Sequence, residues 1–371
     1  MRTTGRLPLL EMDMRHKKLM LVPWLLAALL LVGCGPKPTP PPDTEQSADF
    51  FAMDTFMSFR FYGGDETLAH QLQTAVKDME SELSVVGEDS AVYQLNHTGS
   101  THLSDTGADL LRQALALCNE TDGALDISVY PVVRAWGFTG AAPEEGSARI
   151  PAPEEGSARI PAPETLQRLL ERVNYRQIRL EGNDVSLPEG MEIDLGSVAK
   201  GYAGDMLARM LKDAGVESAV LALGGNIQTV GSRPDGGAWR VGVQSPDKDG
   251  LLGVLSVSDR AVVTSGGYER FFTDDDGNIW WHIMDPSTGY PAQSGLVSVT
   301  VIGPNGLTCD ALSTALFVMG PEKAEDFWRA HRDFEMILAT EDGRLLLTPE
   351  AAGAFEADKN LSYAVEVIGN D

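Results

Sequence analysis

The stretch IDLGSVAKGYAGD, residues 193–205, runs from apolar residues through a glycine turn into a predicted helix. The pattern predicts a buried strand over residues 191–195 and a helix with Lys200 in its first turn. Backbone N–H groups at a helix start, assisted by a nearby ammonium group, commonly bind anions such as phosphate. The stretch is not a Walker P-loop, because Gly201 and Tyr202 follow the lysine where Ser or Thr would have to stand. The sequence therefore predicts an anion site of another kind.

The rest of the chain combines helical and strand-like patterns without regular alternation, which favours an α+β fold over a doubly wound parallel sheet. We expect a compact α/β domain over residues 50–371, with mixed, mostly antiparallel sheets flanked by helices. The predicted helices cover residues 66–83, 108–119, 163–173 and 196–214, with two more between 311 and 331. The predicted strands cover residues 50–62, 191–195, 219–223, 239–244, 253–257, 279–284 and 296–302, with hairpins at 182–184 and over 334–347.

Charge balance narrows the choice of ligands. The chain has 371 residues, with 29 Lys and Arg against 54 Asp and Glu, a formal net charge of −25. Such a charge repels nucleic acid, so a nucleic-acid partner is not expected. A diphosphate ligand would need local positive charge at its site, most economically a divalent cation.

The N-terminal residues have the pattern of a bacterial export signal. Basic residues precede an apolar run over residues 19–32, and LVGC at residues 31–34 resembles a lipobox. We expect a signal over residues 1–34, with Met14 as an alternative start, and a lipid-bearing Cys34 that anchors the exported chain to the cell membrane. A Pro-rich tether over residues 35–49 would follow. A transmembrane anchor is the alternative, but the apolar run is short for a span.

Two further features lie within the predicted domain. The ten residues 142–151 recur unchanged at 152–161, which indicates a duplicated loop rather than a solenoid unit. Cys118 and Cys309 would meet an oxidising compartment after export, where they either pair or remain buried free thiols.

Several separated motifs, in the same order, resemble the ApbE-type FAD:protein FMN transferases. The resemblance runs from about Phe51 to the C-terminal strands and includes the stretch quoted above. Its other motifs are DISVYP at 126–131 with WGF at 136–138, TSGGYER at 264–270, HIMDPSTGYP at 282–291 and TCDALSTAL at 308–316.

This resemblance implies an ApbE-like fold and an exported, Mg²⁺-dependent enzyme. The enzyme would transfer FMN from FAD to a threonine hydroxyl of an acceptor protein and release AMP. The implied acceptors are threonine-containing flavoproteins of extracytoplasmic redox complexes. The resemblance assigns flavin or FAD contacts to Met53, Ala124, Leu125, Asp126, Asp194, Lys200 and Met284. It assigns metal ligands to Asp310 and Thr314, and a main-chain ligand to Ser197.

Local spacing allows two interpretations of the residues that would perform chemistry. Asp310 and Thr314 lie one helical turn apart, so their oxygens share one face and suit Mg²⁺. From spacing alone, the favoured interpretation is a helix N-terminal carboxylate at Asp310 and a packing threonine at Thr314. His282 is either a packed side chain or the base that accepts the proton of the attacking hydroxyl. Asp285 would orient His282 or replace it as the base.

The sequence departs from the family pattern at three positions. Asp54 replaces a usual glycine, Val86 stands where an aromatic residue commonly stacks, and Ser313 replaces an acid near the metal. Loss of a stacking ring costs about 1 kcal/mol of binding free energy. Two alternative functions therefore stay open: an FAD pyrophosphatase that uses water as the acceptor, and a non-enzymatic flavin-storing lipoprotein.

Overall fold

The computed structural model of the chain describes residues 44–139, 160–274 and 276–369. The predicted signal with Cys34, and the duplicated segment up to residue 159, lie outside these ranges. No helix within them combines the length and the apolar character needed to cross a membrane. The described residues belong to one unit. The predicted tether was wrong in its last residues, because a strand already begins at Glu45.

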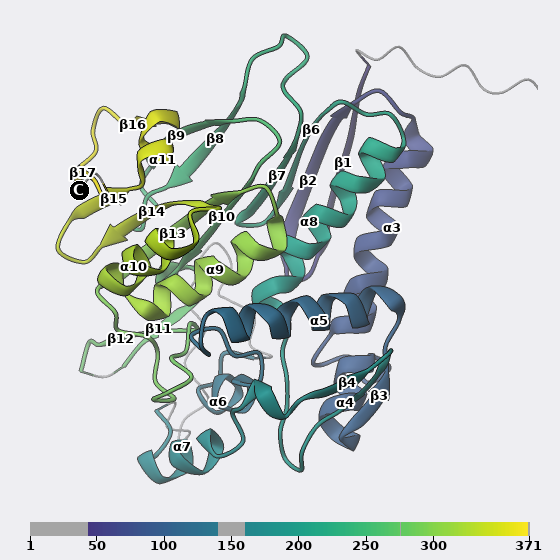
Figure 1. Ribbon diagram of the computed structural model, residues 1–371, viewed down its shortest axis with the longest axis vertical. Helices are drawn as coiled ribbons and strands as arrows, with labels where there is room; N and C mark the ends of the chain where they lie inside the picture. Colours follow the sequence, from purple (N-terminus) through teal and green to yellow (C-terminus); the bar gives the residue numbers. More distant parts are fainter. Residues whose placement is uncertain (1–43, 140–159, 275, 370–371) are drawn as a thin grey trace, which may run out of the picture. The chain divides into compact units, whose positions relative to one another are not determined.

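A mostly antiparallel sheet forms the centre of this unit (Figure 1). Among the described residues it has nine strands, in the order β1-β2-β6-β7-β10-β13-β14-β15-β17, and only β15 and β17 pair in parallel. The strands are β1 (Glu45–Ala52), β2 (Thr55–Tyr62), β6 (Ser218–Leu223), β7 (Asn226–Val230), β10 (Ala261–Gly266), β13 (Leu296–Gly303), β14 (Glu335–Thr340), β15 (Arg344–Leu347) and β17 (Ala364–Val367).

Smaller sheets and helices surround the central sheet, which confirms the predicted α+β class. The smaller sheets are β16 (Phe355–Ala357) with β9 (Leu251–Val257) and β8 (Trp239–Gln244); β3 (Ser100–His102) with β5 (Asp184–Ser186) and β4 (Arg179–Glu181); and β11 (Phe271–Thr273) with β12 (Ile279–Trp281). The helices are α3 (Glu66–Leu83), α4 (Ala91–Thr98), α5 (Asp105–Glu120), α6 (Tyr130–Ala135), α7 (Pro163–Leu170), α8 (Gly196–Asp213), α9 (Gly306–Met319), α10 (Pro321–His331) and α11 (Pro349–Ala354), with 3₁₀ turns at Tyr175–Gln177 and Gly267–Glu269.

The central sheet is covered on both faces. Alternate residues of β10 and β13, such as Val263 and Val301, pack in one hydrophobic cluster with α9 and α10. Their neighbours Val262 and Ile302 pack in another cluster with β8, β9 and α11. Because both faces are buried, these strands lack the polar–apolar alternation of a half-exposed strand. Of these two strands, the sequence analysis predicted β13 from its long apolar run and missed β10; it also missed β7, in which four of five residues are buried.

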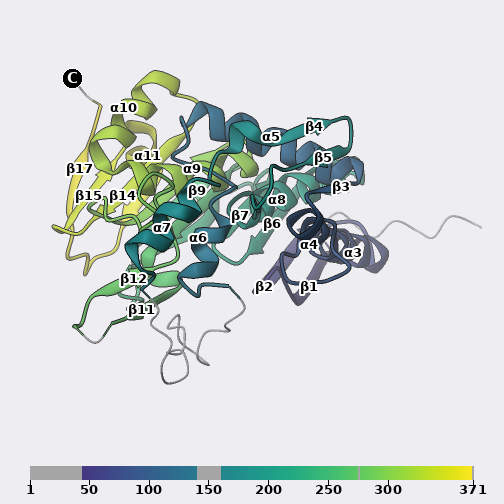
Figure 2. The ribbon, with the colours of Figure 1, turned by 90° about the horizontal axis from the view of Figure 1, so that it is seen from below.

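A fourth cluster joins α6, α7 and β11 beside the central layers (Figure 2). Trp136 of α6 is fully buried there, and its indole N–H donates to the carbonyl of Gly289 at 2.8 Å. Phe272 of β11 packs against the same ring. This cluster holds the loop after β12, which carries the candidate residues His282 and Met284, against α6.

Three predicted strands need correction. The strand expected over residues 50–62 is a hairpin, because Met53 and Asp54 form a two-residue turn with φ of 50° and 57°. This turn geometry suits the twist of a hairpin. Residues 191–195 form no strand ladder. The strand expected over 279–284 ends at Trp281, so His282 lies beyond it and Met284 forms only an isolated bridge.

Candidate functional site

The candidate site lies at one end of the central sheet. Leu223 of β6 pairs both with Met57 of β2 and, across a two-residue glycine turn, with Asn226 of β7. Asn226 in turn pairs with Val263 of β10. The turn between β1 and β2, the start of β7 and the residues that follow β10 therefore meet at the same end (Figure 1).

Beside this end of the sheet, two carboxylates join helices α8 and α9 by accepting hydrogen bonds from backbone N–H groups. Asp205 of α8 accepts hydrogen bonds from the backbone N–H groups of Gly306, at 2.7 Å, and Leu307, at 2.9 Å, at the start of α9. In return, Asp310 Oδ2 of α9 accepts from the N–H of Gly201 at 2.8 Å. Hydrogen bonds to a charged carboxylate are stronger than neutral ones, so these bonds fix how the helices sit on each other.

These bonds also set the register of the candidate metal ligands. Gly201 of α8 contacts Asp310 of α9, and Asp205, one turn later in α8, contacts Gly306, one turn earlier in α9. The two helices are therefore antiparallel. The same register, extended by one helical turn, predicts that Ser197 faces Thr314. A buried carboxylate, a hydroxyl and a helix-start carbonyl are hard oxygen donors, which fit Mg²⁺.

No cluster of three or more His, Cys, Asp or Glu side chains suited to a metal occurs among the described residues. Mg²⁺ usually keeps several waters and takes part of its shell from substrate phosphates. Burial raises the pKa of Asp310, while Lys200, the Gly201 N–H and the Asn226 amide oppose this rise. A bound cation would favour the ionised carboxylate further.

Lys200 and Asp194 flank the start of α8. Asp194 Oδ1 accepts from the N–H of Gly196 at 2.8 Å, which orders the glycine turn. Lys200 Nζ folds back and donates to the Gly196 carbonyl at 3.3 Å. The backbone N–H of Asp194 donates to the Ile127 carbonyl at 2.9 Å, which ties the turn to the predicted flavin segment, residues 124–126. Burial raises the pKa of Asp194, against the opposing charges of Lys200 and Arg270.

His282 is held by Arg270, the residue that follows the 3₁₀ turn after β10. Its Nδ1 lies 3.2 Å from the Arg270 carbonyl and so must carry the proton that it donates there. Nε2 is then the nitrogen that can accept a proton. Burial, reinforced by the charges of Arg270 and Lys200, lowers the pKa of His282 to about 4. The ring is therefore neutral at pH 7, as a base requires.

Asp285 does not orient His282, contrary to the sequence-based expectation. Its Oδ1 accepts from the N–H of Ser287 at 2.8 Å and from the Ser287 hydroxyl at 2.7 Å, which closes a local turn. No described contact joins the two residues, and the Arg270 carbonyl takes the orienting role. Met284 is 5% exposed and its side chain packs in the cluster of α6 and β11.

Asp126 braces its own loop. Oδ1 accepts from the backbone and the hydroxyl of Ser128, at 2.8 and 2.6 Å, and Oδ2 accepts from the N–H of Tyr175 at 3.2 Å. Its carboxylate is therefore engaged within the protein. Of its neighbours, Leu125 is buried and Ala124 is half-buried. A ligand contact from this segment would come from its backbone.

The turn at Met53 and Asp54 approaches the same group of charges. The backbone N–H of Met53 donates to Glu80 Oε1 at 2.6 Å, so α3 holds the turn. Asp54 Oδ2 lies 3.8 Å from Arg270 Nη2, and the Asp54 charge also acts on Asp194. Val86, where the family pattern has an aromatic ring, is 64% exposed.

The structure thus brings together Asp194, Lys200, His282 and Asp310, which the sequence analysis singled out. It adds Arg270 and Asn226, to which that analysis assigned no role. Arg270 lay within a quoted motif, but its partners are remote in sequence and no spacing rule reveals them. Cys118 and Cys309 are both buried and free, so they are not paired. Burial raises the pKa of the Cys118 thiol to about 12, which makes it unreactive.

A helix start with a lysine, a hard-oxygen donor set and a neutral histidine define an enzyme site for a phosphate-bearing substrate. Residues 53–338 match the ApbE family. The FAD:protein FMN transferase of Escherichia coli K12 is 33% identical over 91% of this chain and 97% of its own length. That of Treponema pallidum is 34% identical over 68% of this chain and 71% of its own.

Solved structures agree with these sequence matches. The ApbE protein of Thermotoga maritima superposes with a TM-score of 0.74 at 28% identity, over 84% of this chain and all of its own. The flavin transferase ApbE of Vibrio cholerae gives 0.72 at 26% identity, over 85% of this chain and all of its own. The chain belongs to the ApbE family and shares the enzyme class of these relatives.

Proposed function

We propose that this protein transfers the FMN part of FAD to a threonine hydroxyl of an acceptor protein, with Mg²⁺, and releases AMP. The observation that carries the proposal is the hydrogen bond from the N–H of Gly201 in α8 to the carboxylate of Asp310 in α9. This contact joins the predicted anion site of Lys200 to the predicted metal ligands. The names of the relatives supply the donor and the kind of acceptor.

The metal would be held by Asp310, Thr314 and the main chain at Ser197, where it would neutralise charge on the diphosphate. Lys200, at the start of α8, would bind the diphosphate oxygens. Arg270 adds a second cation near Asp194 and His282. These charges offset, at one place, the repulsion that an acidic chain exerts on FAD.

His282 receives the proton of the acceptor hydroxyl at Nε2, the nitrogen that its hydrogen bond to Arg270 leaves free. The threonine oxygen forms a bond to the phosphorus of the FMN half, and the bond from that phosphorus to the bridging oxygen breaks. AMP departs with that oxygen. Atoms balance without any redox partner, because the flavin itself is only carried.

The test is to incubate the full-length protein with FAD, Mg²⁺ and a threonine-containing acceptor, and to measure intact acceptor mass and AMP together. We expect one FMN on the acceptor for each AMP. AMP without modified acceptor would show that water is the acceptor and the protein is a pyrophosphatase. FAD bound without either product would overturn an enzymatic role in favour of flavin storage.

We also propose that the protein is exported and anchored to the membrane by a lipid on Cys34, where it meets acceptors that belong to extracytoplasmic redox complexes. The support is the lipobox-like LVGC at residues 31–34. Cys34→Ser should leave the protein without lipid and release it from the membrane fraction. A Cys34→Ser protein that still sediments with the membrane would contradict this anchoring.

A further inference from the structure

Asn226 is a buried polar residue at the site with no role in the scheme above. It begins β7 after the two-residue glycine turn and is 4% exposed. Its Nδ2 group has no hydrogen-bond partner among the described groups. An unpaired buried donor costs about 1–3 kcal/mol, so its retention calls for an explanation.

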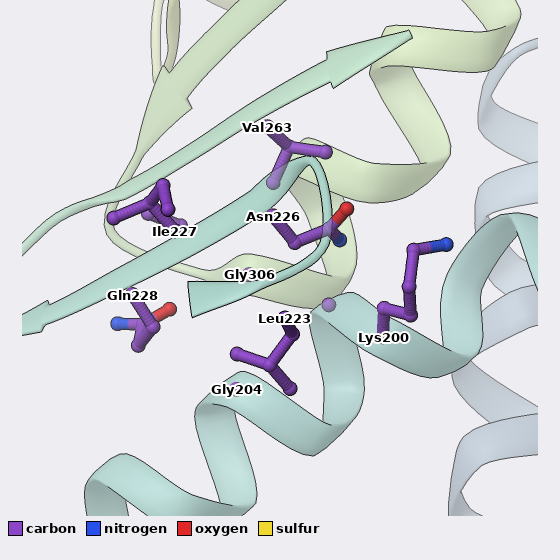
Figure 3. Close-up of a pocket in the computed structure, with 10 residues that line it drawn as sticks. Lys200, Gly204, Leu223, Asn226, Ile227, Gln228, Val263 and Gly306 are labelled. Atoms are coloured by element: carbon purple, nitrogen blue, oxygen red, sulfur yellow. The ribbon is translucent and has the colours of Figure 1, made fainter. Parts of the chain in front are cut away.

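The surroundings of Asn226 point to Asp310. Asn226 lines a small cavity together with Lys200, Gly201 and Gly306, where α8 and α9 meet β7 and β10 (Figure 3). Gly201, another wall of this cavity, donates its N–H to Asp310, and a Cβ added at Gly201 would lie 2.7 Å from the Cβ of Asp310, so the Asp310 side chain lies beside the cavity. Asp310 Oδ2 is already taken by the Gly201 N–H.

We infer that Asn226 is a positioning residue, whose amide steers the Asp310 carboxylate into its metal-binding orientation. The backbone holds the amide in place. Gly224 has a φ of 68° and faces Thr55 of β2, and the carbonyl of Gly225 accepts from the N–H of Thr264 in β10 at 3.3 Å. The glycine turn is thus clamped between two strands, and β7 starts at a fixed point. An Asn226 amide held in this position would restrict rotation of the Asp310 carboxylate about its side-chain bonds.

Direct contact between Asn226 and the substrate is the less suitable explanation. The side chain is almost entirely buried, and the walls of its cavity are backbone at Gly201 and Gly306. A Cβ added at Gly201 would lie 2.2 Å from the Gly306 carbonyl oxygen, so these two walls already lie in close contact. A phosphate group would not enter this space, whereas the carboxylate of Asp310 is part of its surroundings.

Gln228 provides a matched control. It lies two residues along the same strand, lines the same cavity, is 6% exposed and also has an unpaired atom, Oε1. A Cβ added at Gly204 would lie 3.3 Å from the Cβ of Gln228, and one added at Gly306 would lie 3.0 Å from Gln228 Oε1 and 3.2 Å from Asp205 Oδ1. Gln228 therefore lies beside Gly204 and Asp205.

The experiment measures Mg²⁺ affinity by calorimetry, without FAD, on the full-length protein and on Asn226→Ala and Gln228→Ala. Partners that orient a metal ligand typically change metal affinity about 10–100-fold. We expect that loss in Asn226→Ala and less than a threefold change in Gln228→Ala. Equal affinities in Asn226→Ala and the unchanged protein would overturn the inference, as would an equal loss in both variants.

This inference rests on the proposed metal site, and the outcomes separate the two. Failure of the unchanged protein to bind Mg²⁺ both without FAD and in its presence would overturn the proposed function as well. Binding by the unchanged protein that Asn226→Ala does not weaken would overturn only the role of Asn226. Circular dichroism and urea unfolding check that each variant is folded. If Asn226→Ala does not fold, Asn226→Ser replaces it, because serine keeps a shorter hydrogen-bond donor. We expect Asn226→Ser to fall between Asn226→Ala and the unchanged protein.

Discussion

Gly201→Ala tests most sharply whether the contact between α8 and α9 builds the site. The added Cβ would lie 2.2 Å from the carbonyl oxygen of Gly306 and 2.7 Å from the Cβ of Asp310. Both atoms belong to α9, and the oxygen is backbone, so no rotation of a side chain can relieve the clash. The helices must move apart, and the hydrogen bond from Gly201 to Asp310 lengthens as they do.

The expected magnitude follows from three opposing contributions. Alanine in place of glycine stabilises a helix interior by about 1 kcal/mol. Overpacking in a close contact costs about 1–3 kcal/mol. Loss of a hydrogen bond to a charged carboxylate costs about 1.5–3 kcal/mol. The free energy of unfolding should therefore fall by about 2–4 kcal/mol, and Mg²⁺ affinity should fall with it.

Gly204→Ala, on the same helix, is the control. The nearest atom to its new Cβ is Gln228 Cβ, at 3.3 Å, a tight contact that is far less severe than the 2.2 Å contact at Gly201. We expect the free energy of unfolding to stay within about 1 kcal/mol of the unchanged protein, because the gain in helix propensity offsets the contact. Urea unfolding and Mg²⁺ titration of both variants give the comparison. If Gly201→Ala is as stable as Gly204→Ala and binds Mg²⁺ normally, the reasoning about this contact is refuted.

Four further predictions concern His282, Asp54 and Asp126. His282→Ala should reduce transfer about 10²–10⁴-fold with FAD binding retained, and an unchanged rate would remove His282 as the base. The pKa of His282 is about 4 in the folded protein and about 6.5 in the unfolded chain, so the free energy of unfolding should decline as pH falls from 6.5 towards 4. The transfer rate should show no step near pH 6.5. Asp54→Gly should tighten FAD binding at low salt, and glycine suits the positive φ of 57° at this position. The control is Asp259→Asn, at a residue with φ of 50° that pairs with Lys212, and it should not tighten FAD binding. Equal effects of the two variants in a binding titration would contradict this prediction. Asp126→Asn should lower the free energy of unfolding by about 1–3 kcal/mol in urea, because an amide cannot accept all the bonds made by the carboxylate, and unchanged stability would show that the brace is dispensable.

Local patterns in the sequence were sufficient to predict much of the frame. Helix α3 was predicted with its observed bounds, because its apolar residues recur on one face and Asp65 caps its start. The end of α8 was likewise visible at Gly215, which has a φ of 78°. The pairing of Asp310 with Thr314 on one helix face followed from the helical period.

The remaining features depend on contacts between distant parts of the chain. The turn at Met53 and Asp54 lacks the usual Asn-Gly signal, and a methionine at positive φ is uncommon. Its geometry is supported by Glu80, which lies on α3. Asn226 and Arg270 acquire their roles only when β7 and β10 lie beside α8 and α9. No local pattern at either residue indicates such a neighbour.

The most direct measurement compares the full-length protein with Asp310→Asn, using FAD, Mg²⁺ and a threonine-containing acceptor, and follows acceptor mass over time. Asp310→Asn keeps the shape of the side chain but removes the charge that would hold the metal. We predict one FMN added by the unchanged protein and at least a hundredfold slower addition by Asp310→Asn. Addition by Asp310→Asn at the unchanged rate would contradict a metal-dependent site between α8 and α9.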